Sequence, residues 1–336
     1  MYMKQITYNV IVIVLMLLPV IGKSQGSPQF SHNRFNLLKF NPGFAGQKEN
    51  ICTGLIHRDQ WRGFEGGIRT TVVNAHAPFQ LFGKSHGVGV SIMQDNFAFN
   101  SDFVANLAYS YKIQTDNGTF GLGINAGVTY VTMDVENGWQ AETSASSDPY
   151  IPAASGKSVP GFDAGIGLFY SNDNLYAGIS GLHLYNSYKI QSQDQVVKPL
   201  QLNKAINLVA GYTVPLNNPD FKMQHGFMIN YDLSPFSDIT ENKSQISQLI
   251  QINLSETLIY KETIWGGLSY RYGDAIIGRV GAKLFKDVKI GVAYDFGTSV
   301  INDYNNFHGS FELLVHYCFD LKVDKKTKGY KSIRFL

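Results

Sequence analysis

Residues that could catalyse a reaction or bind a metal are spread thinly along this chain. The eight histidines stand at positions 32, 57, 76, 86, 183, 225, 308 and 316. No pair of them has the spacing with which metal ligands recur on one element. The sequence therefore predicts neither a metal site nor any other cofactor.

Two short motifs match catalytic or nucleotide-binding signatures only in part. Ser180 lies in the run Gly178-Ile179-Ser180-Gly181, but Leu182 stands where a nucleophile elbow needs its last glycine. The glycines at 121, 123 and 127 are not followed by the crossover helix of a dinucleotide-binding unit. We therefore predict that the protein is not an enzyme, although an outer-membrane hydrolase could place serine and histidine on a barrel wall without any motif.

These glycines belong instead to a strand with two different faces, at residues 119–131. Its apolar face consists of Phe120, Leu122, Ile124, Ala126, Val128 and Tyr130, and its small or polar face of Gly121, Gly123, Asn125, Gly127 and Thr129. A strand sends alternate side chains to opposite faces. The pattern is typical of a strand that has lipid on one side and a barrel lumen on the other.

The same alternation recurs along almost the whole chain and predicts about fourteen strands. We expect them at residues 51–61, 66–77, 87–96, 102–114, 119–132, 160–171, 174–183, 202–215, 220–232, 247–254, 262–272, 275–284, 287–297 and 310–321. The alternation is weakest at 66–77 and 247–254.

The connections between these strands alternate in length. Short turns at 115–118, 172–174 and 217–220 are rich in Asn, Asp, Gly and Pro, and longer loops lie near 133–159, 184–201, 233–246 and 298–309. Bacterial outer-membrane barrels have short periplasmic turns and longer outer loops, and an even strand number returns both termini to the periplasm. The predicted fold is therefore all-β, a transmembrane antiparallel β-barrel with periplasmic termini in the cell outer membrane.

The composition fits such a barrel better than a soluble β-sandwich, which also has alternating strands. Charged residues make up 16% of the chain, against roughly 25% in an average globular protein, and a solvated sheet face should carry more Lys and Glu. The formal net charge of +2 predicts no nucleic-acid partner. A mean hydropathy of −0.10 argues against a membrane protein built of helices.

Both ends of the chain are expected to lie outside the barrel wall. Lys4, the apolar residues 10–21 and the small residues Gly22 and Ser24 have the order of a secretory signal peptide. We divide the chain into a signal peptide (1–24), an extended N-terminal periplasmic or lumenal segment (25–49), the barrel (50–321) and a basic periplasmic tail (322–336). The tail is either simply solvated or an electrostatic docking segment.

The two cysteines, Cys52 and Cys318, would stand on neighbouring strands of this barrel. Cys52 begins the first predicted strand and Cys318 lies near the end of the last, and alternation points both toward the lumen. The periplasm is oxidising, but a disulfide needs Cα atoms about 4.4–6.8 Å apart, so a two-residue shift in register would forbid it. The sequence leaves open a disulfide across the seam or two free buried thiols.

Alternation also predicts which charged side chains face the lumen. They are Lys112, Arg271, Arg279, Lys283, Lys289, Asp295, Glu312 and Asp320. Since both signs occur, these residues could form ion pairs that fill the lumen or could line a weakly selective pore. Arg58 and Gln60 share a face of the first strand, and we expect Arg58 to pair with a lumenal carboxylate rather than to contact a substrate.

An N-terminal motif resembles that of a known family. The segment opens with Pro28-Gln29-Phe30 and reaches Asn41-Pro42-Gly43-Phe44-Ala45-Gly46, and Arg58-Asp59-Gln60-Trp61 follows in the first strand. It is similar to the opening of the PorP/SprF family of Bacteroidetes outer-membrane proteins, with a pattern like PQFSQ…N…NPAYAG and then R-x-Q-W. Gly43 stands where Ala is usual, and His32 where Gln is common.

The resemblance singles out residues for a structural or docking role: Pro28, Gln29, Phe30, Asn41, Pro42, Gly43, Gly46, Arg58, Gln60 and Trp61. The run Asn41-Pro42-Gly43 is open to two interpretations, which are compatible. It is a turn that leads the chain into the first strand, or it is a periplasmic docking or lumen-lining element.

The resemblance implies an accessory outer-membrane barrel of the type IX secretion system. Such a barrel would support export or surface attachment of a large secreted protein, for example a gliding adhesin, by binding and scaffolding. Its partners would be outer-membrane lipid, other secretion components, some of them periplasmic, and the secreted protein. A passive pore or small-solute transporter is the alternative, and the sequence does not decide whether the lumen is open or filled.

Overall fold

The chain folds into one closed antiparallel sheet. The computed structural model describes residues 27–48, 50–64, 66–98, 100–133, 156–192, 195–197, 204–233, 250–285, 287–298 and 309–319. The strands in these ranges are β1 (Ile51–Gln60), β2 (Ile68–Leu81), β3 (Lys84–Phe97), β4 (Asn100–Thr115), β5 (Gly118–Met133), β6 (Gly156–Ser171), β7 (Leu175–Ser192), β8 (Gln195–Val197), β9 (Lys204–Pro215), β10 (Phe221–Leu233), β11 (Ile250–Tyr260), β12 (Ile264–Arg271), β13 (Ala275–Leu284), β14 (Val288–Gly297) and β15 (Ser310–Phe319).

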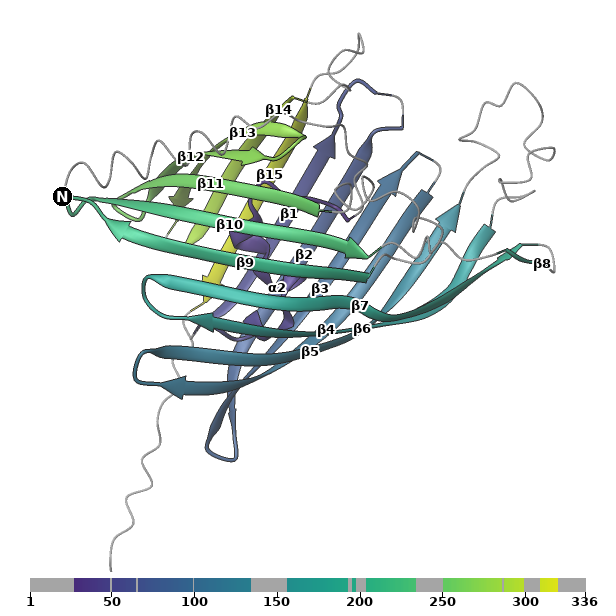
Figure 1. Cartoon of the computed structure of the whole chain (residues 1–336), viewed down its shortest axis with the longest axis horizontal. Coiled ribbons are helices and arrows are strands. Elements are labelled where there is room, and N and C mark those ends of the chain that lie inside the picture. Colours follow the sequence, from purple (N-terminus) through teal and green to yellow (C-terminus); the bar gives the residue numbers. More distant parts are fainter. Residues whose placement is uncertain are drawn as a thin grey trace, which may run out of the picture.

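The strands form a ring in sequence order (Figure 1). Each pairs with its neighbour, β1 pairs with β15, and β6 pairs with β7, while β7 also pairs with β9. Fourteen strands build the wall, and the short β8 pairs only with the last residues of β7. The predicted barrel of about fourteen strands is confirmed, and the weakly alternating segments at 66–77 and 247–254 correspond to β2 and β11.

The predicted loop at 184–201 was wrong in part. β7 continues to Ser192, and the pairing of 189–191 with 157–159 of β6 extends the hairpin. The residues of this extension are mostly polar, so they lack the apolar alternation that marks a lipid-facing strand. The sheet continues here through backbone hydrogen bonds, and the pattern of side chains therefore does not predict this part of the strand.

The two rims of the barrel carry different connections. At one rim all the turns are short, at residues 82–83, 116–117, 172–174, 216–220, 261–263 and 285–287, and we call it the short-turn rim. The longest connections, 134–155, 234–249 and 298–309, join strands at the opposite rim. β1 begins and β15 ends at the short-turn rim, so both ends of the wall lie together.

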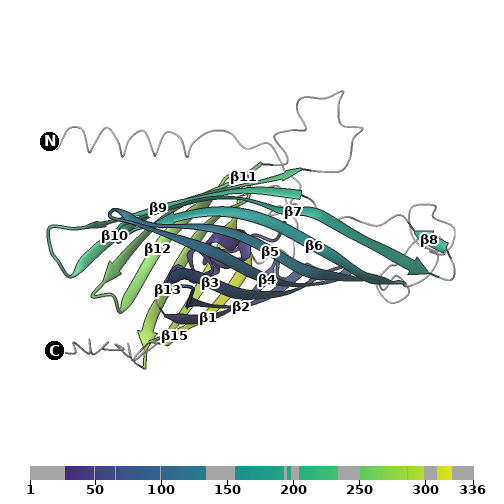
Figure 2. The ribbon, with the colours of Figure 1, turned by 90° about the horizontal axis from the view of Figure 1, so that it is seen from below.

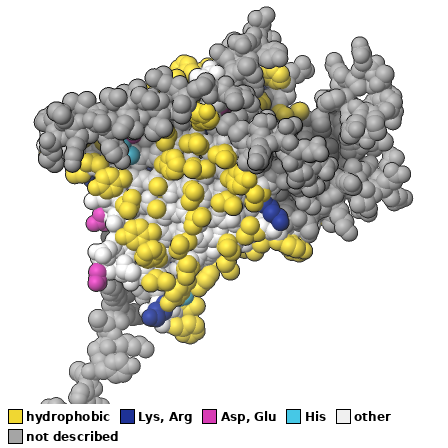
Figure 3. Space-filling model, viewed as in Figure 1, with side chains coloured by type: hydrophobic (Ala, Val, Ile, Leu, Met, Phe, Trp, Pro, Cys, Tyr) yellow, Lys and Arg dark blue, Asp and Glu magenta, His cyan; other side chains and the backbone are white. Residues whose placement is uncertain are grey.

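The outer face of the wall is apolar. Figure 3 shows hydrophobic side chains spread across the visible strands, with few charges among them. Some of the most exposed large hydrophobic side chains in the wall are Leu107, Ile124, Phe162, Leu268 and Val280. An apolar surface of this extent is unfavourable in water and matches the hydrocarbon of a membrane.

A charge on this face is expected to destabilise the barrel. Val292 lies near the middle of β14 with its side chain on the outer face, so Val292→Arg should lower the free energy of unfolding by about 2–4 kcal/mol. Gly278→Ala is the matched control, because a Cβ there meets nothing within 4 Å. Urea unfolding in a lipid bilayer ranks the two variants, and a loss for Val292→Arg no larger than that for Gly278→Ala would show that Val292 does not face lipid. Gly291 is a poorer control, since its added Cβ would lie 2.8 Å from His32 Nε2 in the lumen.

The N-terminal segment lies inside the barrel. It carries η1 (Asn33–Asn36), α2 (Leu37–Phe40) and η2 (Pro42–Phe44), and Figures 1 and 2 show these short helices enclosed by the strands. We call residues 27–48 the plug. The sequence predicted an extended segment, and short helices form instead because buried backbone groups need hydrogen-bond partners. None of the helices in the described residues is long and apolar enough to cross a membrane.

Candidate functional site

The plug and the inward face of the wall share a hydrophobic core. This core consists of Phe30, Leu37 and Phe40 from the plug and Ile56, Val72, Met93, Val104, Phe169, Val209, Met228, Trp265 and Leu314 from the wall. All of these side chains are at least nine-tenths buried. A barrel of this strand number is wider than its own inward side chains can fill, so the plug supplies the missing apolar contacts. Alternation had predicted a small or polar lumenal face, and the core is where the wall departs from it.

The glycine face of β5 contacts the turn in η2 directly. A Cβ on Gly123 would lie 2.6 Å from Gly43 Cα, and a Cβ on Gly43 would lie 2.6 Å from Gly121 O. Distances this short do not occur between real Cβ atoms and backbone, so both surfaces require glycine at the contact. The small face of the strand at 119–131 therefore leaves room for the backbone of Pro42 and Gly43, which packs directly against it.

Hydrogen bonds fix the same turn to the wall. Asn41 Nδ2 donates to the carbonyl oxygens of Leu168 at 3.0 Å and Ile179 at 3.1 Å, and Asn41 Oδ1 accepts from Gly43 N at 2.8 Å. Lys112, one of the predicted lumenal charges, donates from Nζ to Gly43 O at 2.9 Å. The run from Asn41 to Gly43 is thus a lumen-lining element in contact with β4, β5, β6 and β7.

A buried ionic network lies along the inner face of the neighbouring strands β12 to β15 and β1, beside the plug. Arg58 Nη2 donates to Asp295 Oδ2 at 2.7 Å, and Arg58 Nη1 lies 3.5 Å from Glu312 Oε2. Arg271 Nη1 donates to Asp295 Oδ2 and to Asp274 Oδ2, both at 2.9 Å. Arg58, Arg271, Asp295 and Glu312 are at most 2% exposed. Charges buried this deeply persist only when they are paired and hydrogen-bonded.

The network holds the plug through Ser31 and His32. Both backbone N–H groups donate to the Glu312 carboxylate at 2.7 Å, and Ser31 Oγ donates to Asp295 Oδ1 at 2.7 Å. His32 Nδ1 lies 2.9 Å from Glu312 Oε1, and Arg279 Nη1 donates to Ser31 O at 3.1 Å. Sequence reasoning did not select Ser31 or His32 as site residues, although their place within the motif was an available signal.

The remaining motif residues lie elsewhere in the plug and at the end of β1. Pro28 and Gln29 open the plug, and Gln60 Oε1 accepts from Arg58 Nε at 3.2 Å. Gly46 has a φ of 63°, which favours glycine, and it leads the plug toward β1. Trp61 follows the last residue of β1, is half-buried, and lines a small pocket with Asp59 and Arg62.

The other predicted lumenal charges lie toward the short-turn rim. Lys283 Nζ pairs with Asp287 Oδ1 at 2.9 Å, and Lys289 Nζ lies 5.9 Å from the centre of the Phe35 ring of the plug. Asp320 lies outside the described residues. Charges of opposite sign thus meet mainly toward the rim opposite the short turns, where β1, β12 and β14 end and β15 begins, and lysines gather near the short-turn rim.

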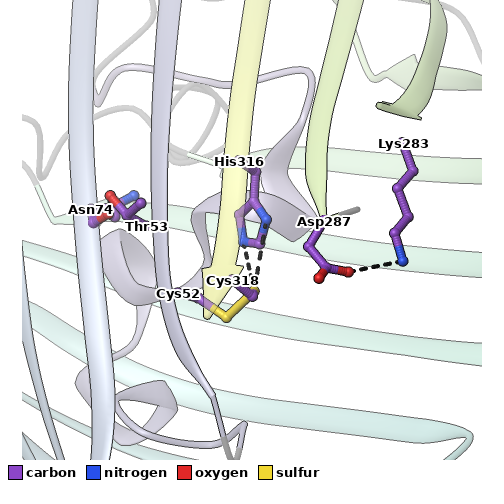
Figure 4. Close-up of a disulfide and its surroundings, with 7 residues drawn as sticks. All are labelled: Cys52, Thr53, Asn74, Lys283, Asp287, His316 and Cys318. Carbon is purple, nitrogen blue, oxygen red and sulfur yellow. Dashed lines mark hydrogen bonds and ion pairs between the residues drawn. A yellow bond between two sulfur atoms is a disulfide. The ribbon is translucent and has the colours of Figure 1, made fainter. Parts of the chain in front are cut away.

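Cys52 and Cys318 are joined by a disulfide across the seam of the barrel (Figure 4). The register of β1 with β15 sets the two residues opposite each other. Their Cα atoms are 4.0 Å apart, slightly closer than the usual range of about 4.4–6.8 Å. His316 lies on the same lumenal side, with a ring nitrogen 4.0 Å from Cys318 Sγ. Of the two alternatives that the sequence left open, the structure has the bonded one.

The disulfide is expected to stabilise the closure of the barrel. Because it links residues 266 positions apart, Cys318→Ala with Cys52→Ala should lower the free energy of unfolding by about 2–5 kcal/mol. Urea unfolding of the double variant and of the reduced native protein should agree. Mass spectrometry without reductant should find one linked peptide pair, and two thiols that alkylate after unfolding would contradict the bond.

The family is shown by comparison with protein-family models. Residues 22–317 match the model described as type IX secretion system membrane protein PorP/SprF. The chain belongs to the PorP/SprF family. The resemblance read from residues 28–61 is therefore confirmed, and this PorP/SprF protein is an outer-membrane β-barrel rather than a member of a known enzyme family. A search of curated proteins found no match.

This PorP/SprF protein is also similar to several solved structures. The TodX deltaS2S3 mutant monoaromatic hydrocarbon channel is 14% identical, with 84% of this chain and 94% of that chain covered and a TM-score of 0.46. The Ralstonia pickettii toluene transporter TbuX is 12% identical over 84% and 93% of the two chains, with a TM-score of 0.46. The Acinetobacter baumannii outer membrane protein Omp33 is 9% identical over 81% and 100%, with a TM-score of 0.41.

Proposed function

We propose that this barrel is a closed accessory component of the type IX secretion system. In this role it supports export or surface attachment of a large secreted protein by binding and scaffolding, and it does not itself carry solutes. The observation that supports the proposal is the filled lumen, in which Arg58, Asp295 and Glu312 bind one another and the plug. A lumen held by a buried network and a shared hydrophobic core fits a binding role better than free passage.

In this role the two rims of the barrel would bind different partners. By the usual orientation of such barrels the short-turn rim faces the periplasm, where other secretion components would bind. The opposite rim, with the longest connections, would face the cell exterior and the secreted protein. The basic residues of 322–336 then extend from the periplasmic side.

Protease added to intact cells tests this orientation. We expect cleavage within residues 134–155 and an intact 322–336 tail, because only the exterior rim is reachable. An epitope at each position gives the readout, and lysed cells serve as the control in which both are cut. Cleavage of the tail alone in intact cells would reverse the orientation.

Deletion of the gene tests the function. The deletion strain should lose one particular large surface protein from its surface proteome, while uptake of small solutes stays unchanged. Complementation with the native gene should restore that protein. An unchanged surface proteome together with reduced solute permeability would support the passive pore or small-solute transporter instead.

A further inference from the structure

A cavity of about 280 Å³ remains between the plug and the short-turn rim. An adjoining cavity of about 500 Å³ shares Arg34, Phe44, Lys48, Asp173 and Tyr176 with it. Both lie on the rim side of the plug, because the turns at 172–174 and 261–263 contribute lining residues. We call the two together the vestibule.

The charges that line the first cavity are unbalanced. Five cationic side chains line it, Arg34, Lys48, Lys222, Arg279 and Lys289, against two carboxylates, Asp173 and Glu262. The second cavity adds one carboxylate, Asp116, and no further cation. Lys222 and Glu262 form an ion pair, which removes one charge of each sign. The Arg279 guanidinium is engaged by Ser31 O and by Thr257 Oγ1 at 3.0 Å.

Four cations of the vestibule therefore have no carboxylate within 4.0 Å among the described residues, namely Arg34, Lys48, Arg279 and Lys289. Because neutral acceptors hold Arg279, the other three are the candidates for binding an anion. Arg34 donates to the neutral Gln224 side chain, and Lys289 lies over the Phe35 ring. The structure leaves Arg34 and Lys48 accessible to solvent although protein surrounds them.

The cations also repel one another. Enclosure by the surrounding protein, together with the nearby Lys289 and Arg34, lowers the pKa of Lys48 to about 8. Like charges gathered at a concave surface with little counter-charge create a positive potential that concentrates anions. A bound anion would relieve the repulsion and supply acceptors for the donors of all three side chains.

We infer that the vestibule binds a carboxylate-rich segment of another polypeptide, which enters through the short-turn rim. Two adjoining cavities suit an extended chain better than a single small anion, and Phe35 and Tyr176 offer apolar and aromatic contact beside the cations. This chain's own tail has the wrong charge to be the occupant, since 322–336 carries six Lys or Arg and one Asp. The inference rests on the proposed role only in expecting that this segment belongs to a periplasmic component.

Binding of a fluorescein-labelled oligoglutamate to the purified full-length protein in lipid nanodiscs tests the inference. Fluorescence anisotropy should show binding that weakens with added salt, and an oligoglutamine of equal length should not bind. Lys48→Gln and Lys289→Gln should each weaken binding about tenfold, the effect of losing one charge-assisted hydrogen bond. Lys84→Gln is the matched control, because Lys84 begins β3 at the same rim but does not line the vestibule.

Several results would overturn the inference. They are absence of oligoglutamate binding, equal binding of oligoglutamine, or equal losses in Lys48→Gln and Lys84→Gln. Citrate that binds as tightly as oligoglutamate in calorimetry would assign the site to free small anions instead. An intact disulfide and an unchanged thermal unfolding transition show that each variant is folded. The experiment uses purified protein, so its failure is distinguishable from a failure of the secretion role.

Discussion

Removal of the plug is expected to turn a closed barrel into an ion-conducting pore. In planar lipid bilayers the intact protein should show no steady conductance. A chain that lacks residues 27–48 should show a steady conductance at least about tenfold above the background of the intact protein. The reason is that inward side chains alone do not fill a barrel of this width. The deletion exposes the inward apolar side chains Ile56, Val72 and Leu314 to water, so some loss of stability is expected as well.

A milder variant separates opening of the pore from misfolding. In Gly123→Val the added side chain occupies the space of Gly43 Cα, so the plug is displaced at one contact while its sequence is kept. Conductance should then be intermittent and lower than that of the deletion. Ile124→Val is the matched control, since Ile124 is the adjacent residue of β5 and its side chain lies on the outer face.

The disulfide reports whether these variants have closed barrels. Because Cys52 and Cys318 lie on the first and last strands, a bonded pair without added oxidant indicates that the seam has formed. If the intact protein conducts as well as the deletion variant, the lumen is open and the passive-pore alternative describes the protein better.

Loss of the Asp295 charge is expected to be the most damaging single substitution in the lumen. The Asp295 carboxylate pairs with Arg58 and Arg271 and accepts from Ser31 of the plug. Asp295→Asn keeps the shape but leaves two buried guanidinium groups short of negative charge. Removing one partner of a buried ion pair typically costs about 3–5 kcal/mol, and urea unfolding in detergent or lipid measures it.

The same protein offers an exposed counterpart as a control. Asp59 lies 3.4 Å from Arg62 Nε and 3.7 Å from Arg69 Nε, but its side chain is 31% exposed. Asp59→Asn should cost less than about 1 kcal/mol, since water screens the charges that remain. Equal losses for the two variants would mean that the lumen is hydrated at Asp295 and that the network is not buried in solution.

Asp295→Asn should also weaken the hold on the plug. Ser31 Oγ loses a charged acceptor, so the start of the plug is held by fewer charged contacts, with Glu312 as the remaining carboxylate that accepts from Ser31 and His32. We therefore expect brief conducting events in bilayers that Asp59→Asn does not show. If Asp295→Asn is less stable but shows no conducting events, the network stabilises the wall without being needed to hold the plug.

The sequence by itself determined the barrel and its strands, because the relevant signal is local. Side chains alternate with a period of two on every strand, and lipid requires one apolar face. The alternation within runs such as 119–131 and 288–296 is therefore enough to predict that each run forms a strand. Closure of the barrel makes the first and last strands neighbours. A disulfide between Cys52 and Cys318 could therefore be considered from the sequence, before the register of the two strands was known.

Only the tertiary structure decided what fills the lumen. Arg58 finds Asp295 at a sequence separation of 237 residues, and no local pattern encodes that choice among several lumenal carboxylates. The glycines of β5 show a small face in the sequence, but their purpose depends on a backbone that approaches from residues 42 and 43. The disulfide likewise required a register that a shift of two residues would have lost. The alternation of side chains along each strand is enough to specify the wall. The contacts between the wall and the plug form only when segments far apart in the sequence are brought together.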